Sequence, residues 1–499
     1  MQILDRLEQS DTASVAAASR GLRVTSEESL YSHVHLDWMS PPLERVLSLF
    51  YAIRNHPDLA AHIQHVSMLS SELRYPAEDP EEEWVPPDID GDWSQLSSQY
   101  QDELNFAKEI ITREQFPSPE KWTEALENGD PYAFVAVLLS QLHNLRSLRL
   151  DYTFVWQSGF PGLMMRHAML STPSDTTLSR FSVLSLVEYG LNAPGSRLWN
   201  ETLYNYIDAF PVCNPEQFAG WFYLPALKSL EIWLQSFEGV GEELSKRSSK
   251  LTHLANLERL VLTESSVEEE DIRNLLSLLS SVKSLNLGLV YPSQDKEKGS
   301  RQTSPRPPFS KQGVLFDGIM SVKDTVEHLS ISLELCPIFF ACFWSEQKFE
   351  NLEHGMKPFQ GFLKKFPRLQ TAELPSAMLF GWNHDYAPSL SEVIPSRLQK
   401  LCLRGNLTCV YGYDWDLELV AAVVRNFLPE AQSKTPLLNT ITLRIFEIGG
   451  DSDFWQSYAV PVQSAAKQLE LEMDITLISD SLSPGRWTTS RELKEYVPE

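Results

Sequence analysis

An apolar spacing recurs along this sequence and leaves few folds open to it. Four segments of the 499-residue chain place apolar residues at relative positions 0, 3, 6 and 8. They are Leu142, Leu145, Leu148 and Leu150; Leu224, Leu227, Leu230 and Ile232; Leu254, Leu257, Leu260 and Leu262; and Leu279, Val282, Leu285 and Leu287. The last two positions fall on one face of a short strand, and the steps of three suit a helical turn before it. The spacing therefore predicts a repeated unit of turn and strand.

Further segments carry the same spacing less completely. A fifth copy, Phe366, Leu369, Ala372 and Leu374, differs by one small residue. Weaker copies keep three positions: Ile63, Val66 and Met68; Leu178, Phe181 and Val183; Val326, Leu329 and Ile331; Leu398, Leu401 and Leu403; Leu438, Ile441 and Leu443; and, approximately, Leu469, Leu471 and Met473. One copy alone would be an ordinary amphipathic strand or a buried helix turn, but so many copies favour a repeat array.

The spacing resembles the LxxLxxLxL signature of leucine-rich repeats. The resemblance implies an α/β fold: an irregular solenoid, or horseshoe, over residues 37–480, with parallel strands on its concave face and helices and insertions on the convex side. The intervals between copies, roughly 25 to more than 45 residues, are longer and less even than is typical of the family. Residues between the two apolar positions of a strand should then face outward on the concave side, where a target protein binds. The candidate target-binding residues are Arg149, Glu231, Val261, Asn286, Glu373, Cys402 and Thr442.

The first 36 residues do not follow the repeat. Ile3, Leu4 and Leu7 make one helical face, and Val15, Ala18 and Leu22 have helical spacing. The stretch from Glu28 to Leu36 then passes from a helix end into a strand-like alternation. We therefore expect two short helices followed by a strand.

This segment resembles an F-box. Ile3, Leu4 and Leu7 match the apolar residues of its first helix, Asp11 matches the start of its second, and Ala18-Ser19-Arg20 and Ser29–Leu36 match its later part. The resemblance implies that Ile3, Leu4, Leu7, Val15, Ser19 and Arg20 bind a Skp-family adaptor. The chain departs from the pattern at Thr12 and Ala18, and the opening Leu-Pro-x-Glu would precede Met1. Either the natural chain starts upstream, or the F-box is degenerate; the alternative is a helical cap for the solenoid.

Charge and cysteine content narrow the partners and the compartment. The formal net charge of −25 disfavours nucleic acid and anionic membranes, which attract basic surfaces. The five cysteines form no CxxC pair, and no secretory signal or apolar run of about 20 residues occurs. We expect a cytoplasmic or nuclear protein.

Three stretches interrupt the repeat pattern. Residues 76–92 are acidic and proline-rich, and we expect an exposed loop there. Residues 293–313 are basic and polar with almost no core residues, so we expect a disordered insertion. Residues 481–499 form a C-terminal tail.

Motifs of catalysis are missing from the sequence. There is no GxxxxGK[ST], HExxH or GxSxG, so we expect no enzyme activity, cofactor or metal. The leading hypothesis is a substrate-recognition subunit of a cullin–RING (SCF-type) ubiquitin ligase, which binds the Skp-family adaptor through its N-terminal helices and a target through the concave face. The alternatives are a repeat scaffold without ubiquitin ligase association, and an enzyme of a type that the motifs do not reveal.

Overall fold

The computed structural model divides into two compact units, which we describe separately. Unit 1 comprises residues 1–193, 209–233 and 237–257, and unit 2 comprises residues 194–208, 234–236 and 258–499. The structure describes residues 14–15, 17–38, 41–70, 92–156, 158–170, 176–192, 213–234, 237, 240–241, 244, 252–265, 267–292, 312–336, 361–405, 415, 417–447, 460–469 and 471–479.

The described strands are all parallel, and within each unit they pair in chain order. Unit 1 holds β1 (His33–Trp38), β2 (His65–Ser70), β3 (Ser147–Asp151), β4 (Leu186–Leu191) and β5 (Ser229–Ile232). Unit 2 holds β6 (Arg259–Ser265), β7 (Ser284–Pro292), β8 (His328–Cys336), β9 (Thr371–Pro375), β10 (Lys400–Arg404), β11 (Thr440–Glu447) and β12 (Glu472–Ser479). Parallel strands that neighbour one another in chain order need a crossover between them, and here helices supply most of these crossovers.

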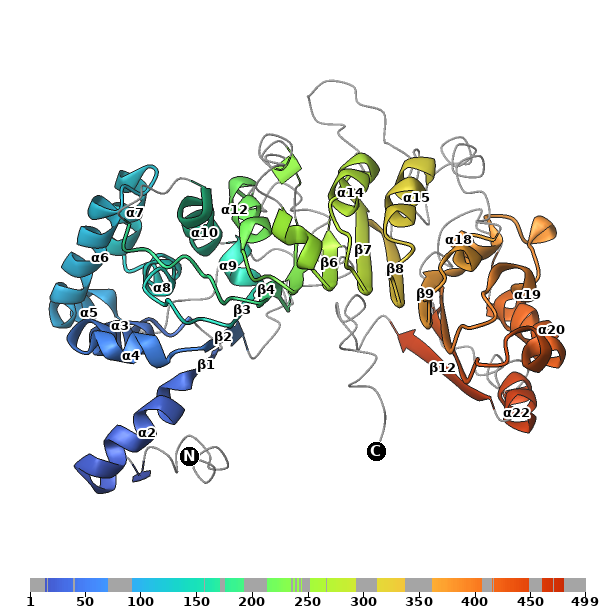
Figure 1. The fold of residues 1–499 in the computed structure, drawn as a ribbon, viewed down its shortest axis with the longest axis horizontal. Helices are drawn as coiled ribbons and strands as arrows, with labels where there is room; N and C mark the ends of the chain where they lie inside the picture. The colour runs from blue at the N-terminus through green and yellow to red at the C-terminus, as the bar shows by residue number, and fades with distance from the viewer. Residues whose placement is uncertain are drawn as a thin grey trace, which may run out of the picture. The chain divides into compact units, whose positions relative to one another are not determined.

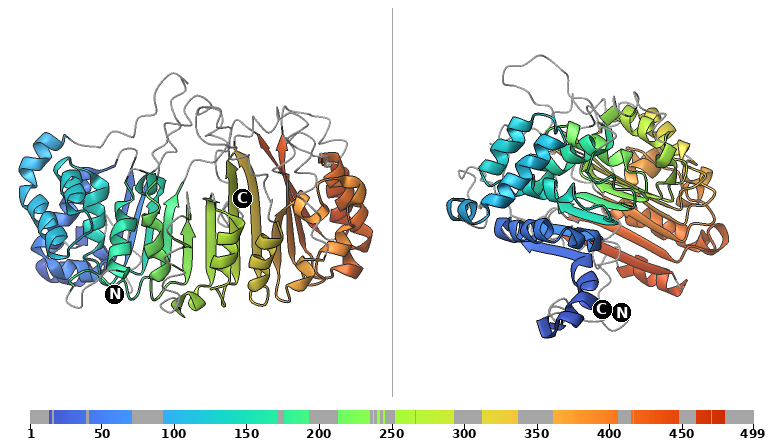
Figure 2. Two further views of the ribbon diagram at one scale, coloured as in Figure 1. Left: turned by 90° about the horizontal axis from the view of Figure 1, so that it is seen from above. Right: turned by 60° about the vertical axis from the view of Figure 1, so that its left-hand side comes forward.

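The helices of each unit lie on one side of its strands, except for α2, which projects away beside β1 (Figures 1 and 2). In unit 1 they are α2 (Arg20–Ser32), α3 (Leu43–Asn55), α4 (Pro57–His62), α5 (Trp93–Gln99), α6 (Gln101–Arg113), α7 (Pro119–Glu127), α8 (Pro131–Leu139), α9 (Tyr152–Trp156), α10 (Phe160–Leu170), α12 (Glu216–Ala219), η3 (Gly220–Tyr223) and η5 (Thr252–Asn256). In unit 2 they are α14 (Glu269–Leu276), α15 (Gln312–Ser321), η6 (Leu363–Lys365), α18 (Ser376–Phe380), η7 (His384–Tyr386), α19 (Leu390–Val393), α20 (Leu417–Lys434) and α22 (Val460–Gln468).

Two helices show how the sequence sets their burial. In α3 the residues Leu43, Val46, Leu47, Phe50 and Ile53 are buried, and their spacing puts them on one helical face. Helix α8 is buried along its whole length and is apolar all round. Its first turn is capped by Asp130, whose carboxylate accepts from the backbone N–H of Tyr132 at 2.8 Å and of Ala133 at 3.2 Å. Among the described helices, none is long and apolar enough to cross a membrane.

The apolar spacing places two rows of side chains, which we call ladders, on the helix side of each unit. The first ladder holds the residues at relative position 6 of the spacing, and the second holds those at position 8. In unit 2 the first ladder joins Leu260, Leu285, Leu329, Ala372, Leu401, Ile441 and Met473. In unit 1 the second ladder joins Leu36, Met68, Leu150, Tyr189 and Ile232, all of them buried. The α/β class and the parallel strands expected from the sequence are confirmed.

The expected repeat at Leu178 is wrong in its register. Val183 is 39% exposed and precedes the strand, whereas Leu184, Val187 and Tyr189 are buried. The spacing 0, 3, 6 and 8 begins at Phe181, with an aromatic residue at each end. The inward residue of this strand is Tyr189, and an aromatic residue at that position does not match the aliphatic LxL pattern.

The N-terminal segment and the three interruptions fall only partly within the described residues. The boundary expected at residue 36 lies inside β1, which pairs in register with β2. Asp92 caps α5 by accepting from the backbone N–H of Ser94, and Gln312 and Gly313 belong to α15 rather than to an insertion. The rest of 76–92 and 293–313, and the tail 481–499, lie outside the described residues.

Candidate functional site

The strand residues between the two ladder positions form one row in each unit, which we call the strand-face row. In unit 1 the row joins His35, Ser67, Arg149, Glu188 and Glu231. In unit 2 it joins Val261, Asn286, Ser330, Glu373, Cys402 and Thr442. Because successive strand residues point to opposite faces, these side chains point away from the ladders and the helices. All seven candidate target-binding residues lie in these rows.

The expectation that these residues are exposed is wrong for five of them. Glu231, Val261, Asn286, Glu373 and Cys402 are buried, and Val261 has an exposed fraction of 0%. Parallel strands lie about 4.8 Å apart, so neighbouring side chains of a row cover one another's flanks.

The two remaining candidates, Arg149 and Thr442, are half-buried and are the accessible ones. In unit 1 the Nε of Arg149 lies 2.6 Å from Oε2 of Glu188 on the next strand. This ion pair satisfies a buried carboxylate that would otherwise be costly. The charges of Arg149 and Glu188 therefore cancel within this part of the row.

Histidines gather at the β1 end of unit 1. His33 and His65 are register partners, and their rings stack with centroids 4.3 Å apart. His65 Nδ1 is hydrogen-bonded to Ser147 Oγ at 2.8 Å. Burial lowers the pKa of His65, and the neighbouring His33 and Arg146 lower it further. On β1, Nε2 of the exposed His35 lies 2.8 Å from Oδ2 of Asp37.

A buried ion cluster lies in the row of unit 2. Oε1 of Glu373 accepts a hydrogen bond from Nη1 of Arg404 at 2.6 Å and forms an ion pair with Nη1 of Arg444 at 3.3 Å. Oε2 of Glu373 accepts from Ser330 Oγ at 3.2 Å. Burial alone would raise the pKa of Glu373, but the two guanidinium groups lower it below its usual range. We call Glu373, Ser330, Arg404 and Arg444 the Glu373 cluster.

Cys402 lies beside this cluster. Burial raises the pKa of its thiol, and the neighbouring carboxylate of Glu373 raises it further. The thiol therefore stays protonated at neutral pH, which makes it a poor nucleophile. Cys402 and Cys213 take part in no disulfide.

Sequence reasoning missed Arg404 and Arg444. Each lies two residues beyond a row residue, Cys402 or Thr442, so it points to the same face. The signal was present: in both strands an arginine directly follows the second ladder leucine, Leu403 or Leu443. Glu188 was missed because the register of its strand was assigned wrongly.

The candidate adaptor-binding residues that the structure describes lie directly before β1 in unit 1. Ile3, Leu4 and Leu7 are outside the described residues. Val15 is half-buried in a helical stretch, Ser19 accepts from the backbone N–H of Leu22 at 3.2 Å as the N-cap of α2, and Arg20 is the first residue of that helix.

Ser19 also breaks the helix. Its φ of −160° and ψ of 157° are extended, so Val15 and Ala18 do not share one continuous helix with Leu22. The continuous helical face expected from their spacing is therefore wrong. Ala18 and Leu22 are nevertheless both exposed, and Leu22 retains 46% of its surface.

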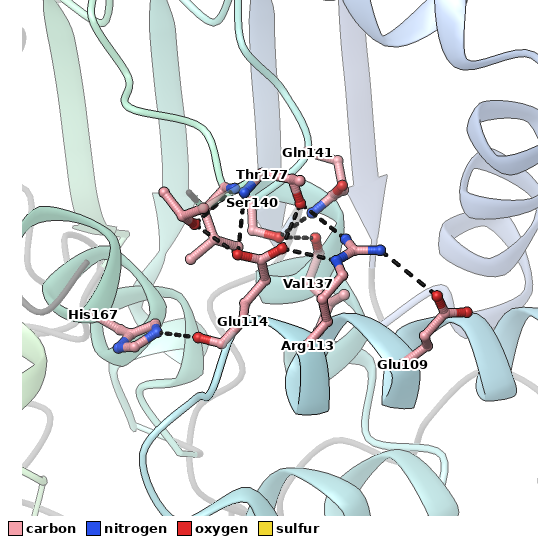
Figure 3. A network of polar contacts seen from close by, with 10 residues as sticks. Glu109, Arg113, Glu114, Val137, Ser140, Gln141, His167 and Thr177 are labelled. Carbon is pink, nitrogen blue, oxygen red and sulfur yellow. Dashed lines mark hydrogen bonds and ion pairs between the residues drawn. The ribbon is translucent and has the colours of Figure 1, made fainter. Parts of the chain in front are cut away.

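A second polar network lies among the helices of unit 1 (Figure 3). Glu114, the residue after α6, accepts hydrogen bonds from the hydroxyls of Thr176 at 2.6 Å and Thr177 at 2.5 Å, and from Arg113 Nε at 2.9 Å. His167 Nε2 donates to its backbone carbonyl at 2.8 Å. Burial alone would raise the pKa of Glu114, but these donors lower it to about 2. The network ties α6 to α10 and to the segment before β4.

Among the described residues, no group of three or more His, Cys, Asp or Glu side chains is placed to hold a metal ion. The polar residues described here form ion pairs and hydrogen bonds within the chain. Comparison with known proteins gives no family assignment: no family model matches the chain, and no curated protein matches it.

Proposed function

We propose that this chain is a substrate-recognition subunit of an SCF-type cullin–RING ubiquitin ligase. The N-terminal helical segment binds a Skp-family adaptor, and the strand face binds a target protein. The subunit contributes no catalytic group; it raises the effective concentration of the target's lysines near the ubiquitin-conjugating enzyme.

The observation that carries the proposal is the way the N-terminal segment joins the strands. Helix α2 ends at Ser32 and β1 begins at His33, with no linker between them. The backbone N–H of Gln64 donates to the carbonyl of Ser32 at 3.0 Å, which ties the junction to the residue before β2. A partner that binds the helical segment is thereby held at a fixed distance from the strands of unit 1.

Exposure along the helical segment supports the same proposal. Ala17, Ala18 and Leu22 are exposed, although a helix packed inside a domain would bury such residues. Together with the resemblance at Ile3, Leu4 and Leu7, they offer apolar surface to an adaptor.

The test is co-purification of the full chain with a Skp-family adaptor. We expect Leu7→Asp and Leu22→Asp to reduce the bound adaptor at least tenfold, because each puts a charge into an apolar contact. Leu437→Asp is the matched control, since Leu437 is 54% exposed in unit 2 and should leave adaptor binding unchanged. Failure of the unaltered chain to bind the adaptor would reject the ligase assignment.

One observation favours a second candidate, a repeat scaffold without adaptor binding. The break at Ser19 divides the second predicted helix, so Val15 and Ala18 do not share one continuous helix with Leu22 as their spacing predicted. Under this candidate the target still binds the strand face, while no adaptor co-purifies.

A further inference from the structure

A pair of histidines lies at the junction between α2 and β1. His33 is the first residue of β1, His65 is the first residue of β2, and the two are register partners. Their imidazole rings stack with centroids 4.3 Å apart and planes at 16° to each other. Directly before them in the chain, the backbone N–H of Gln64 donates to the carbonyl of Ser32 at 3.0 Å. The stack and this hydrogen bond therefore hold the same point, where the helical segment meets the strands.

Each ring is hydrogen-bonded through Nδ1 to a neutral hydroxyl group. Nδ1 of His33 lies 2.8 Å from Ser32 Oγ, and Nδ1 of His65 lies 2.8 Å from Ser147 Oγ. Ser32 Oγ donates its one proton to the carbonyl of Ser29 at 3.0 Å, so it accepts from Nδ1 of His33. An added proton on His33 therefore goes to Nε2 and makes the ring positive without a carboxylate as its partner.

The surroundings of the pair favour neutral rings. Burial, His33 and Arg146, in that order, lower the pKa of His65. On β1, the carboxylate of Asp37 is paired with His35. Among the residues that the structure describes, neither stacked ring forms an ion pair. The other charged or titratable side chains on the neighbouring elements are Glu27, Glu28 and Tyr31 in the second half of α2, Asp58 and His62 on α4, His143 before β3, and Arg149 and Asp151 on β3.

The start of β1 is held less firmly than its end. Among the described strands β1 pairs with β2 alone, so it is an edge strand. Leu36 and Trp38 near its end are buried, whereas His33 and His35 near its start are exposed. The end of β1 is thus anchored in the core, while its start depends on the contacts of the junction. A segment held in this way can open locally without global unfolding.

We infer that the His33–His65 stack makes the junction between α2 and β1 sensitive to acid. Protonation of both rings places two like charges face to face on neighbouring strands, which is unfavourable. The start of β1 then separates from β2 and takes α2 with it. The consequence for adaptor binding rests on the proposed function: an adaptor on the helical segment is held at a fixed distance from the strands only while the junction is closed.

The direction of the pH dependence follows from His65. Its pKa in the closed junction lies below the ordinary value of 6.5, so the open junction takes up protons more readily. The closed junction is therefore fully stable above pH 6.5 and loses stability as the pH falls below that value. The opening equilibrium changes by at most about tenfold per pH unit for each proton taken up.

The test is amide hydrogen exchange of the full chain, resolved to single residues, at pH 7.5 and pH 5.5 and corrected for the intrinsic exchange rates. The N–H of Gln64 reports the junction, because it donates to the carbonyl of Ser32. The N–H of Arg146 is the internal reference, because it donates to the carbonyl of Gln64 at 2.7 Å on the other side. We expect the protection of Gln64 to fall by at least about threefold in acid and that of Arg146 to stay unchanged.

Matched variants decide whether the stack is responsible. His33→Phe keeps an aromatic ring against His65 but cannot be protonated, so it should abolish the acid-induced loss at Gln64. His35→Phe makes the same change two residues along β1, at another exposed position, and should keep the loss. His33→Asn replaces His33→Phe if the latter has lost the protection of Arg146 at pH 7.5. The inference is overturned if the unaltered chain shows no loss, if Arg146 loses protection equally, if the His33 variant keeps the loss, or if His35→Phe abolishes it.

Adaptor co-purification on the same preparations separates this result from the proposed function. A junction that opens in acid in a chain that binds no adaptor would reject the ligase assignment and leave the acid-sensitive junction in place. Adaptor binding together with a Gln64 amide that acid does not affect would reject the acid-sensitive junction and leave the ligase assignment.

Discussion

At the scale of single residues, Glu114 shows how a buried carboxylate ties helices together. In the folded chain its pKa is about 2, against an ordinary value of 4.5, because Thr176, Thr177 and Arg113 stabilise its charged form against the opposing effect of burial. The folded state is therefore favoured wherever the carboxylate is ionised in both states. That stability is fully present above pH 4.5 and is lost as the pH falls from 4.5 toward 2.

We predict that Glu114→Gln lowers the free energy of unfolding by about 1–2 kcal/mol at pH 7, because the amide keeps some of the hydrogen bonds but loses the charge that the donors stabilise. Its stability should also change less between pH 4.5 and pH 2 than that of the unaltered chain. Denaturant titrations over this pH range measure both effects. Glu109→Gln is the control, because Glu109 is exposed and lies 3.7 Å from Arg113. Identical pH profiles for the two variants would contradict this role for Glu114.

At the scale of elements, a strand of this chain is anchored by its two ladder residues and by what covers its other face. We predict that Leu260→Ala and Leu285→Ala each cost about 2–5 kcal/mol, since both side chains are buried in one ladder. Val261→Ala should cost about 1–2 kcal/mol because Val261 is also buried, on the opposite face. Val183→Ala, at an exposed position, should cost less than about 0.5 kcal/mol. Thermal and denaturant melts of the four variants provide the measurement.

The stability of Val261→Ala decides whether the second face of β6 is covered or open to solvent. A loss as small as that at Val183 would mean that the opposite face of β6 is open to solvent, and the alternation of stability and recognition expected from the sequence would then hold for this strand. A loss between those of the ladder leucines and Val183 fits a strand covered on both faces.

The sequence was sufficient to predict elements whose signal lies within a few residues. The spacing around Leu230, Leu260 and Leu285 located β5, β6 and β7 and their inward faces. It failed at β4, where the inward residue is Tyr189, and it did not separate β1 from the helical segment before it. An aromatic ladder residue such as Tyr189 leaves no LxL signal to detect, whereas β1 does carry an apolar pair, Val34 and Leu36, and only the domain boundary was placed inside it.

The placement of the candidate residues on the strand face was predicted from the sequence, but their burial was not. The row residues were identified correctly because a strand alternates strictly between its two faces. Their burial was not predictable, because it depends on which side chains the neighbouring strands place beside them. The Glu373 cluster needs Arg404 and Arg444 from two later strands, and their register with Glu373 is known only from the fold.

At the scale of the whole molecule, the chain divides into two compact units, with β1 to β5 in one and β6 to β12 in the other. In a chain built of stacked repeats, stability is a sum of local terms and interfaces between neighbours, so cooperativity need not extend over the full length. Each unit has its own ladders and its own buried core. We therefore expect the two units to unfold as separate cooperative blocks.

Differential scanning calorimetry of the full chain tests this expectation. We predict two transitions, with a calorimetric enthalpy larger than the van't Hoff enthalpy of either one. Leu148 and Leu401 are buried at the same ladder position of their units, so Leu148→Ala and Leu401→Ala are matched probes. Each should lower only the transition of its own unit, by about 5 °C or more, given a loss of about 2–5 kcal/mol in a block of this size. If both variants lower one shared transition equally, the chain unfolds as a single block, because a local loss would then be felt by every strand.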